Sequence, residues 1–254
     1  MRKIIIRGLI LIMCVSGVMM VRRNLALKKE ELEYSRIQED MLEEASKIGK
    51  EVVRYTKEQP VIKETEGSED QEPDASVYEA PQTLLDEMAA YPDCIGWIDI
   101  EDTNVHYPIM QNESNEYYLH RDKEGKDSVS GCIYMDANHD IHMKGLHAIY
   151  GHHMKNGTMF KDITKFTDTS FMKEHQKITI MTADRAIRLN PIYCYAGMAD
   201  GTYRQVLRSH GQVIQFIMEH TGIEIDTDDL YVLITCSYGG TDERTYLYCV
   251  PDKE

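Results

Sequence analysis

Apolar and polar positions follow three different patterns along the chain, and the first is an unbroken apolar run. Residues 8–21 carry no charge, and residues 4–6 extend the run if Arg7 reaches toward an interface. Such a run is just long enough to span a membrane, and no small-residue cleavage site follows it. We expect residues 1–24 to be an uncleaved membrane anchor, with a cleaved signal peptide as the alternative. Basic residues on both sides leave its orientation undecided.

The second pattern has the period of a helix. Apolar residues recur at steps of three and four at Tyr34, Ile37, Met41, Ala45, Ile48, Val52 and Tyr55. A solvated stalk, a coiled coil and a helix packed on the following domain all fit one stripe of this length. Residues 63–76, KETEGSEDQEPDAS, have no apolar period and indicate a flexible linker. Residues 25–79 are therefore expected to form an acidic helical stalk and linker, with a domain boundary near residue 78.

The third pattern consists of short β-favouring runs. It begins after a predicted helix in residues 80–93, where Leu84, Leu85 and Met88 share one face and Pro92 ends the helix. The runs are rich in Ile, Val and Tyr, and Gly, Asn, Asp or Pro separates many of them. They are IGWIDI, NVHYPIM, GCIYMD, HAIYGH, KITIMTA, RAIRLNPIYCYAG, DLYVLITCS and RTYLYCV. About eight strands with few intervening helices favour a closed or nearly closed β-barrel.

One segment among these strands has helical spacing instead. Residues 202–222 are expected to form a single helix despite Gly211, inserted on the barrel rim between the last strand pairs. The positions that suit this helix are Val206, Leu207, Val213, Ile214, Ile217 and Met218.

Charge then narrows the class of partner. The chain has 28 Lys and Arg residues against 43 Asp and Glu residues, for a formal net charge of -15. Binding to a phosphate backbone needs clustered cations, so we expect no nucleic-acid partner.

The six cysteines differ in their surroundings. They contain no C-x-x-C pair and are too few for a disulfide-dense domain. Cys94, Cys132 and Cys194 are expected to be buried apolar thiols, and Cys14 belongs to the anchor. Cys236 is different, because it ends a strand-like run and precedes the turn-rich segment SYGGTDER. A thiol at a strand end beside a loop is accessible enough to react.

Histidines gather near the middle of the chain, at His139, His142, His147, His152 and His153. Their spacing matches no common zinc motif, so we expect neither a metal nor another cofactor. Neighbouring side chains in a strand point to opposite faces, so His152 and His153 cannot easily serve one centre. One of the two is expected to be a bystander.

The segments YGHHMKNGTMF and LITCSY, followed by Arg244, together resemble the class B sortases, cysteine transpeptidases of Gram-positive cell surfaces. The resemblance extends through PDCIGWIDIEDTNVHYPIMQNESNEYYLHRD and GCIYMDANHD, and covers roughly residues 80–251. It implies a mostly β fold for residues 80–254, a sortase-like closed barrel of about eight strands. An N-terminal helix and a helix inserted before the nucleophile strand complete the expected domain.

The resemblance also assigns roles to single residues. The histidine directly after Tyr-Gly is His152, the nucleophile at the end of the family's T-L-X-T-C motif is Cys236, and the arginine on the next strand is Arg244. The motif departs from the family at Val232, where a threonine is usual. The neighbours of the nucleophile are expected to contact substrate, namely Thr235, Ser237 and Tyr238.

The chemistry of amide exchange explains why these residue types are needed. An amide is a poor electrophile, so a Cys236 thiolate would attack it and form a thioester. His152 would protonate the leaving amine and later accept a proton from the incoming one. Arg244 would hold the substrate carbonyl or the oxyanion. A third catalytic acid is not identifiable, and Asp242 and Glu243 are candidates only by their closeness in sequence.

The resemblance implies a substrate and a compartment as well. A surface protein's C-terminal sorting-signal peptide would be cleaved between threonine and glycine, and an amine of the peptidoglycan precursor would resolve the thioester. The catalytic domain would lie outside the cell membrane, tethered by a single N-terminal span. We also expect Cys236 to be a free thiol, because a disulfide to Cys249 on the adjoining strand would abolish activity.

Two other classes of function remain open. A cysteine hydrolase of another fold would also use Cys and His, but papain-like enzymes place the cysteine before the histidine, the reverse of the order here. A membrane-anchored binding module with an inactive site is the non-enzymatic alternative. It predicts that Cys236→Ala leaves every activity of the protein intact.

Overall fold

The computed structural model describes residues 2–57, 78–236 and 242–252. The chain divides into two compact units, Met1–Glu39 and Asp40–Glu254. Helix α1 (Arg2–Lys57) includes the helix predicted from the apolar stripe. The linker expected at residues 63–76 lies outside the described residues, and the domain boundary near residue 78 remains a prediction.

The expected membrane anchor falls at the start of α1. Among the residues that the structure describes, none of the helices has a stretch long and apolar enough to cross a membrane. Side chains in this helix are described for residues 12–41, 43 and 44, so the first part of the expected anchor lies outside that description.

A short helix, α2 (Gln82–Ala90), precedes the barrel, as predicted. Leu84 is fully buried, which fixes one face of the helix. The helix ends at Ala90. The Tyr91 N–H makes the last helical bond, to the Glu87 carbonyl, but Tyr91 itself is extended, as is usual for the residue before a proline.

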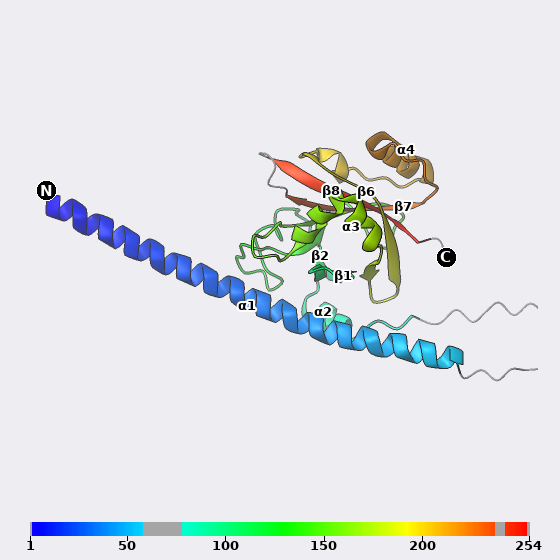
Figure 1. The fold of residues 1–254 in the computed structure, drawn as a ribbon, viewed down its shortest axis with the longest axis horizontal. Coiled ribbons are helices and arrows are strands. Elements are labelled where there is room, and N and C mark those ends of the chain that lie inside the picture. Colours follow the sequence, from blue (N-terminus) through cyan, green and yellow to red (C-terminus); the bar gives the residue numbers. More distant parts are fainter. Residues whose placement is uncertain (1, 58–77, 237–241, 253–254) are drawn as a thin grey trace, which may run out of the picture. The chain divides into compact units, whose positions relative to one another are not determined.

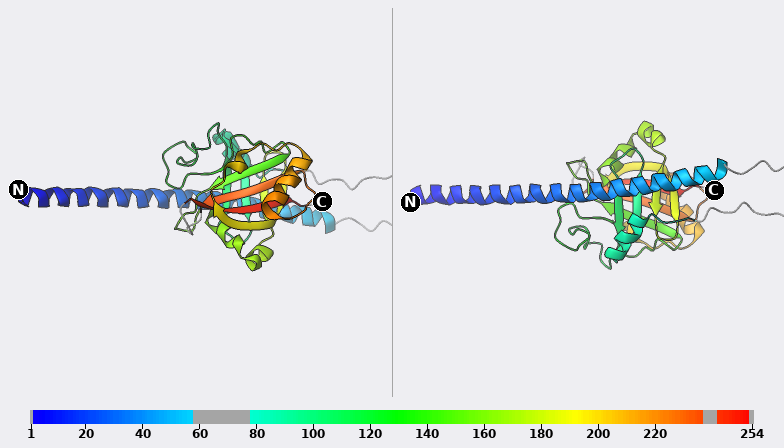
Figure 2. Two further views of the ribbon diagram at one scale, coloured as in Figure 1. Left: turned by 90° about the horizontal axis from the view of Figure 1, so that it is seen from above. Right: turned by 90° about the horizontal axis from the view of Figure 1, so that it is seen from below.

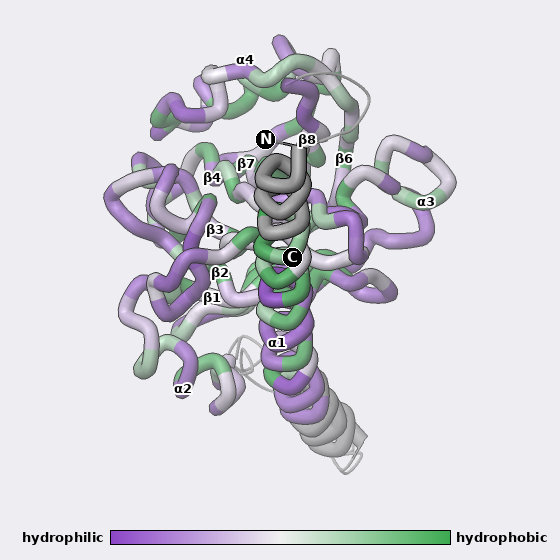
Figure 3. The backbone as a smooth tube through the Cα atoms, turned by 90° about the vertical axis from the view of Figure 1, so that its left-hand side faces the viewer, coloured by the Kyte–Doolittle hydropathy of each residue, from purple (hydrophilic) through white to green (hydrophobic). Residues whose placement is uncertain are grey.

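Eight strands form a closed barrel in the order β1-β2-β3-β4-β7-β8-β6-β5 (Figures 1 and 2). Neighbouring strands are antiparallel except for the parallel pairs β2–β3 and β4–β7. The predicted closed barrel is therefore confirmed, and Figure 3 shows hydrophilic stretches in the segments that connect its strands. The strands are β1 (Cys94–Ile100), β2 (His106–Met110), β3 (Ile133–Met135), β4 (Gly145–Gly151), β5 (Ile178–Met181), β6 (Ala186–Met198), β7 (Asp229–Cys236) and β8 (Glu243–Pro251).

Strand β7 is apolar along almost its whole length because both of its faces are buried. Leu230, Val232 and Ile234 join a core cluster that includes Phe216 and Ile217 of the helix outside the barrel. The alternate residues of β7 face the other way and are buried as well. A strand covered on both sides loses the alternation of polar and apolar residues.

The remaining helical segments lie between the strands. They are η1 (Phe160–Thr167), α3 (Thr169–Glu174), η2 (Gly201–Arg204) and α4 (His210–Thr221). The prediction of one helix over residues 202–222 is wrong in its extent, because an extended segment separates η2 from α4. The Ser209 side chain accepts a hydrogen bond from the Gln212 N–H, and the Gln212 side chain bonds back to Ser209. This capping box starts α4 at His210.

Candidate active site

The register of three adjacent strands brings distant parts of the sequence to one end of the barrel. β4 and β7 are parallel, with Gly151 beside Thr235, so His152 and Cys236 come next at the same edge. β8 runs antiparallel to β7 and places Arg244 beside Cys236. Neighbouring strands lie about 4.8 Å apart. The three residues expected to be catalytic therefore occupy neighbouring backbone positions on three strands.

Gly151 allows β4 to reach this edge. A Cβ atom at this position would lie 2.4 Å from Cδ1 of Ile133 and 2.7 Å from the ring of Phe160. Any side chain here would push the strand away from the barrel interior. The glycine before His152 is thus a packing requirement that sets where the histidine leaves the sheet.

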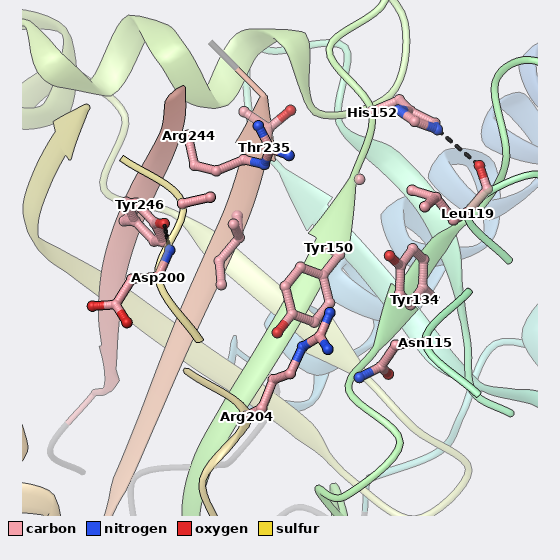
Figure 4. Close-up of a pocket in the computed structure, with 13 residues that line it drawn as sticks. Asn115, Leu119, Tyr134, Tyr150, His152, Asp200, Arg204, Thr235, Arg244 and Tyr246 are labelled. Atoms are coloured by element: carbon pink, nitrogen blue, oxygen red, sulfur yellow. Dashed lines mark hydrogen bonds between the residues drawn. The ribbon is translucent and has the colours of Figure 1, made fainter. Parts of the chain in front are cut away.

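A pocket of about 210 Å³ opens at this end of the barrel (Figure 4). Its walls come from β4, β7, β8 and the segments before β3 and after β6. Among the residues that line it are His152, Thr235, Arg244, Asn115, Leu119, Tyr134, Tyr150, Asp200, Arg204 and Tyr246.

The half-buried imidazole of His152 is oriented by a backbone carbonyl. Its Nε2 lies 2.8 Å from the oxygen of Leu119. A carbonyl can only accept, so Nε2 carries the proton and Nδ1 is the acceptor in the neutral ring. Burial lowers the pKa of His152, and the charges of His120 and Arg244 lower it further, against the opposing effect of the Leu119 carbonyl. The neutral ring is therefore favoured at pH 7.

Arg244 and Thr235 complete the wall beside the nucleophile strand. Nη1 of Arg244 donates to the Glu243 carbonyl at 3.0 Å, and its other donors have no hydrogen-bond partner among the described residues. The Thr235 side chain is 2 % exposed. Within the described part of the chain, its Oγ1 has no hydrogen-bond partner, and neither does Oγ1 of Thr245 directly opposite.

A family model described as the sortase domain matches residues 98–252. The chain belongs to the sortase family. It is 37% identical over 98 residues to sortase B of Listeria monocytogenes, a match that covers 38% of this chain and 40% of that protein. The chain thus spans less than half the length of this curated relative. The resemblance to class B sortases expected from the sequence is confirmed.

Solved sortase B structures share the fold. One from Bacillus anthracis, in complex with AAEK2, has a TM-score of 0.61 and 27% identity, covering 73% of this chain and 88% of that one. A Staphylococcus aureus sortase B–substrate complex has a TM-score of 0.67 over 90% of this chain and 99% of that one. Its identity is 20%, so this second likeness concerns the fold alone.

Only some of the residues expected at the sortase site line the pocket in the structure. His152, Thr235 and Arg244 line the pocket, and the backbone of Cys236 ends β7 beside Arg244. The Cys236 side chain lies outside the described residues, as do Ser237 and Tyr238 entirely. His153 does not line the pocket; its backbone instead bridges to Met159.

The acids near the nucleophile strand give no third catalytic residue. Neither Asp242 nor Glu243 lines the pocket, and the Asp242 carbonyl accepts from the Ala199 N–H at 2.8 Å. The carboxylate that does line the pocket is Asp200, whose Oδ1 accepts from the Thr202 N–H at 2.8 Å. Among the described residues, no group of three His, Cys, Asp or Glu side chains could hold a metal ion.

Burial makes Cys94, Cys194 and Cys249 poor nucleophiles. Burial raises the pKa of Cys94 and of Cys194 to about 12, so both thiols stay protonated. Cys249 is a buried free thiol, and it pairs with Tyr231, five positions before Cys236 on β7. At about 3.3 Å per residue, this places Cys249 about 16 Å along the strand from Cys236. Such a distance excludes a disulfide between them.

Several pocket residues escape sequence reasoning. Leu119 acts through its carbonyl, which every residue type possesses, so no letter in the sequence marks it. Tyr150 resembles the many other strand tyrosines. Arg204 sits in a segment predicted to be the first turn of a long helix, where its side chain had no assigned direction.

Proposed function

We propose that this chain is a cysteine transpeptidase of the class B sortase type, with Cys236 as its nucleophile. The observation that carries the proposal is the strand register. It groups the positions of Cys236, His152 and Arg244 at one barrel end, around a pocket. Membership of the sortase family supports the reaction class.

The reaction proceeds in two halves. Nδ1 of neutral His152 takes the proton of the Cys236 thiol, the thiolate attacks a peptide carbonyl, and a C–S bond forms. The C–N bond then breaks as His152 delivers that proton to the departing amine. An incoming amine attacks the thioester and loses its proton to His152. The new C–N bond forms as the C–S bond breaks, and the proton returns from His152 to the Cys236 sulfur.

The pocket residues favour the charge changes in these steps. Nε2 of His152 is occupied by the Leu119 carbonyl, so Nδ1 is the nitrogen that carries the proton back and forth. The guanidinium of Arg244 stabilises the oxyanion of each tetrahedral intermediate. Thr235, Ser237 and Tyr238 flank the nucleophile and contact the bound peptide.

The substrate is a C-terminal sorting-signal peptide of a secreted surface protein, cleaved between threonine and glycine. The acceptor is an amine of the peptidoglycan precursor. A Staphylococcus aureus sortase B of the same fold was solved as a substrate complex, which is consistent with a substrate site in this fold. Residues 1–24 tether the enzyme to the cell membrane with the barrel outside, an assignment that the uncharged run of residues 8–21 supports.

The test is capture of the acyl-enzyme. The full-length chain is incubated with a library of peptides containing Thr-Gly, with and without an amine acceptor, and Cys236 is examined by mass spectrometry. A thioester on Cys236 that disappears when the amine is added is the expected result. Cys236→Ala should abolish both products, whereas Cys194→Ala, which changes a protonated thiol in β6, should retain them. Turnover by Cys236→Ala at the wild-type rate would exclude the proposed nucleophile.

A further inference from the structure

The pocket holds a second guanidinium that the proposed reaction does not use. Arg204 ends η2 and lines the pocket together with Tyr150 and Asn115. Figure 4 shows its side chain directed toward Tyr150, away from the edge that carries Arg244. A chain with a net charge of -15 therefore presents two cations in one pocket. Such a placement needs an explanation.

The backbone on both sides of Arg204 is fixed. Tyr203 is 1 % exposed, and its hydroxyl bonds to that of Tyr195 at 2.9 Å. The carbonyl of Gln205 accepts from Nε2 of His139 at 3.1 Å. Arg204 is thus an exposed residue between two anchored neighbours, so the backbone from which its side chain extends is held in place.

The carboxylates around this part of the pocket already have partners. Asp136 is fully buried beneath it, and it accepts from the Tyr150 hydroxyl at 3.1 Å and from the Asn115 amide at 2.8 Å. Asp200 caps η2 through the Thr202 N–H. Among the described residues, no carboxylate forms an ion pair with Arg204. Its guanidinium N–H donors therefore face the pocket without an anionic partner there.

The distance from the reacting bond limits what Arg204 can reach. Tyr150 precedes His152 by two residues, which corresponds to about 6–7 Å along β4. An extended peptide advances by about 3.3 Å per residue. A group bound beside Tyr150 therefore belongs to a residue about two or three positions from the bond that Cys236 attacks.

We infer that Arg204 recognises an acidic side chain, aspartate or glutamate, on the donor peptide about two or three residues from the cleaved bond. This inference rests on the proposed transpeptidase function. The guanidinium offers two parallel N–H donors, which match the two oxygens of a carboxylate and not the mixed oxygen and nitrogen of an amide. The pocket thus selects charge as well as shape.

The experiment compares matched peptides that differ by one isosteric change. Asp is exchanged with Asn, and Glu with Gln, at each of the three positions before and after Thr-Gly, and kcat/KM is measured with the full-length enzyme and an amine acceptor. At one position the acidic peptide should be favoured about tenfold or more, as expected for a hydrogen bond to a charged group. Raising the salt concentration should reduce the preference.

Variants assign the preference to Arg204. Arg204→Gln should reduce the rate of the acidic peptide to that of its amide partner, and Arg204→Lys should retain part of the preference. Arg208→Gln is the matched control, because Arg208 is exposed on the same segment and does not line the pocket. Equal rates for all pairs in the wild type, or a preference that survives Arg204→Gln, would overturn the inference.

A binding measurement distinguishes failure of this inference from failure of the proposed function. Cys236→Ala cannot form a thioester, so titration calorimetry on that variant gives Kd for each acidic peptide and its amide partner. If no peptide acylates the wild type but the acidic peptides bind Cys236→Ala more tightly, the transpeptidase proposal fails and the Arg204 site stands. If acylation occurs and the two Kd values agree at every position, the reverse holds.

Discussion

The two ends of strands β4, β7 and β8 have the same scaffold but opposite chemistry. At the end where β4 and β7 begin, polar groups satisfy one another. Lys144 pairs with Asp228, His210 lies 3.0 Å from both Asp226 and Asp228, and the Gly145 N–H donates to Asp229 at 2.9 Å. A hollow of about 430 Å³ is also present there, lined by these and other acids.

At the opposite end, several polar groups have hydrogen-bond donors or acceptors without a partner among the described residues. Nε2 of His152 is bonded to the Leu119 carbonyl and Nδ1 has no described partner. Arg244 donates one hydrogen bond, to the Glu243 carbonyl. The hollow is smaller here, about 210 Å³, yet its cations have no described carboxylate partner. The size of a cavity therefore does not mark the proposed functional end of this barrel. The donors and acceptors that have no partner among the described residues do.

The largest expected effect distinguishes two adjacent histidines at the functional end. His152→Ala should lower kcat/KM for peptide transfer by about 10²–10⁴-fold, because it removes the proton carrier. His153→Ala should stay within about twofold, because His153 lies outside the pocket lining. Steady-state kinetics on both variants measure this, and equal losses would mean that the histidine pair acts as a unit.

A second comparison removes one cation from each end. Arg244→Gln should reduce kcat by about 10²–10³-fold through loss of oxyanion stabilisation. Lys144→Ala removes an exposed cation from the paired end, and its kcat should match the parent. If the two variants lose activity alike, general electrostatics and not a local contact explains the effect.

Two glycines give a smaller contrast in stability. Gly151→Ala should destabilise the fold by about 1–3 kcal/mol, because its Cβ would overlap Ile133 and Phe160. Gly211→Ala should be neutral or stabilise by up to about 1 kcal/mol, because no atom lies within 4 Å of the added Cβ in this helix. Urea unfolding measures both. A harmless Gly151→Ala would show that the end of β4 can relax without cost.

The smallest effects concern histidine titration. Burial lowers the pKa of His106, but the hydrogen bond and charge of Asp99 outweigh burial and leave that pKa raised. Burial lowers the pKa of His152. The unfolded value is about 6.5. His106 therefore stabilises the fold below that pH and loses this contribution as pH rises through its folded pKa, whereas His152 costs stability as pH falls below about 6.5.

NMR titration of the ring protons tests these directions. His106 should titrate above about 6.5 and His152 below it. Asp99→Asn should move the midpoint of His106 downward and leave that of His152 unchanged. A single common midpoint for both rings would contradict the assigned environments.

Much of the barrel was predictable from sequence because each strand carries its own β-favouring run. The meeting of His152, Cys236 and Arg244 was expected only from the family resemblance, since no local pattern reveals that β4 pairs with β7. The break before α4 was readable in principle, because Ser209 and Gln212 have the spacing of a capping box. Apolar periodicity outweighed that evidence in the prediction. The contribution of Leu119 could not be read at all, because a backbone carbonyl leaves no trace in residue type.

The parallel pairing of β4 with β7 also has a consequence for the order of assembly. It joins segments that lie far apart in the chain, with β5, β6 and α4 between them. Contacts of such long range require the closure of a large loop, and they form slowly compared with local structure. In a chain that has not yet formed this pair, the positions of Cys236 and His152 are not neighbours. The proposed nucleophile and its proposed proton carrier therefore meet only in the finished barrel.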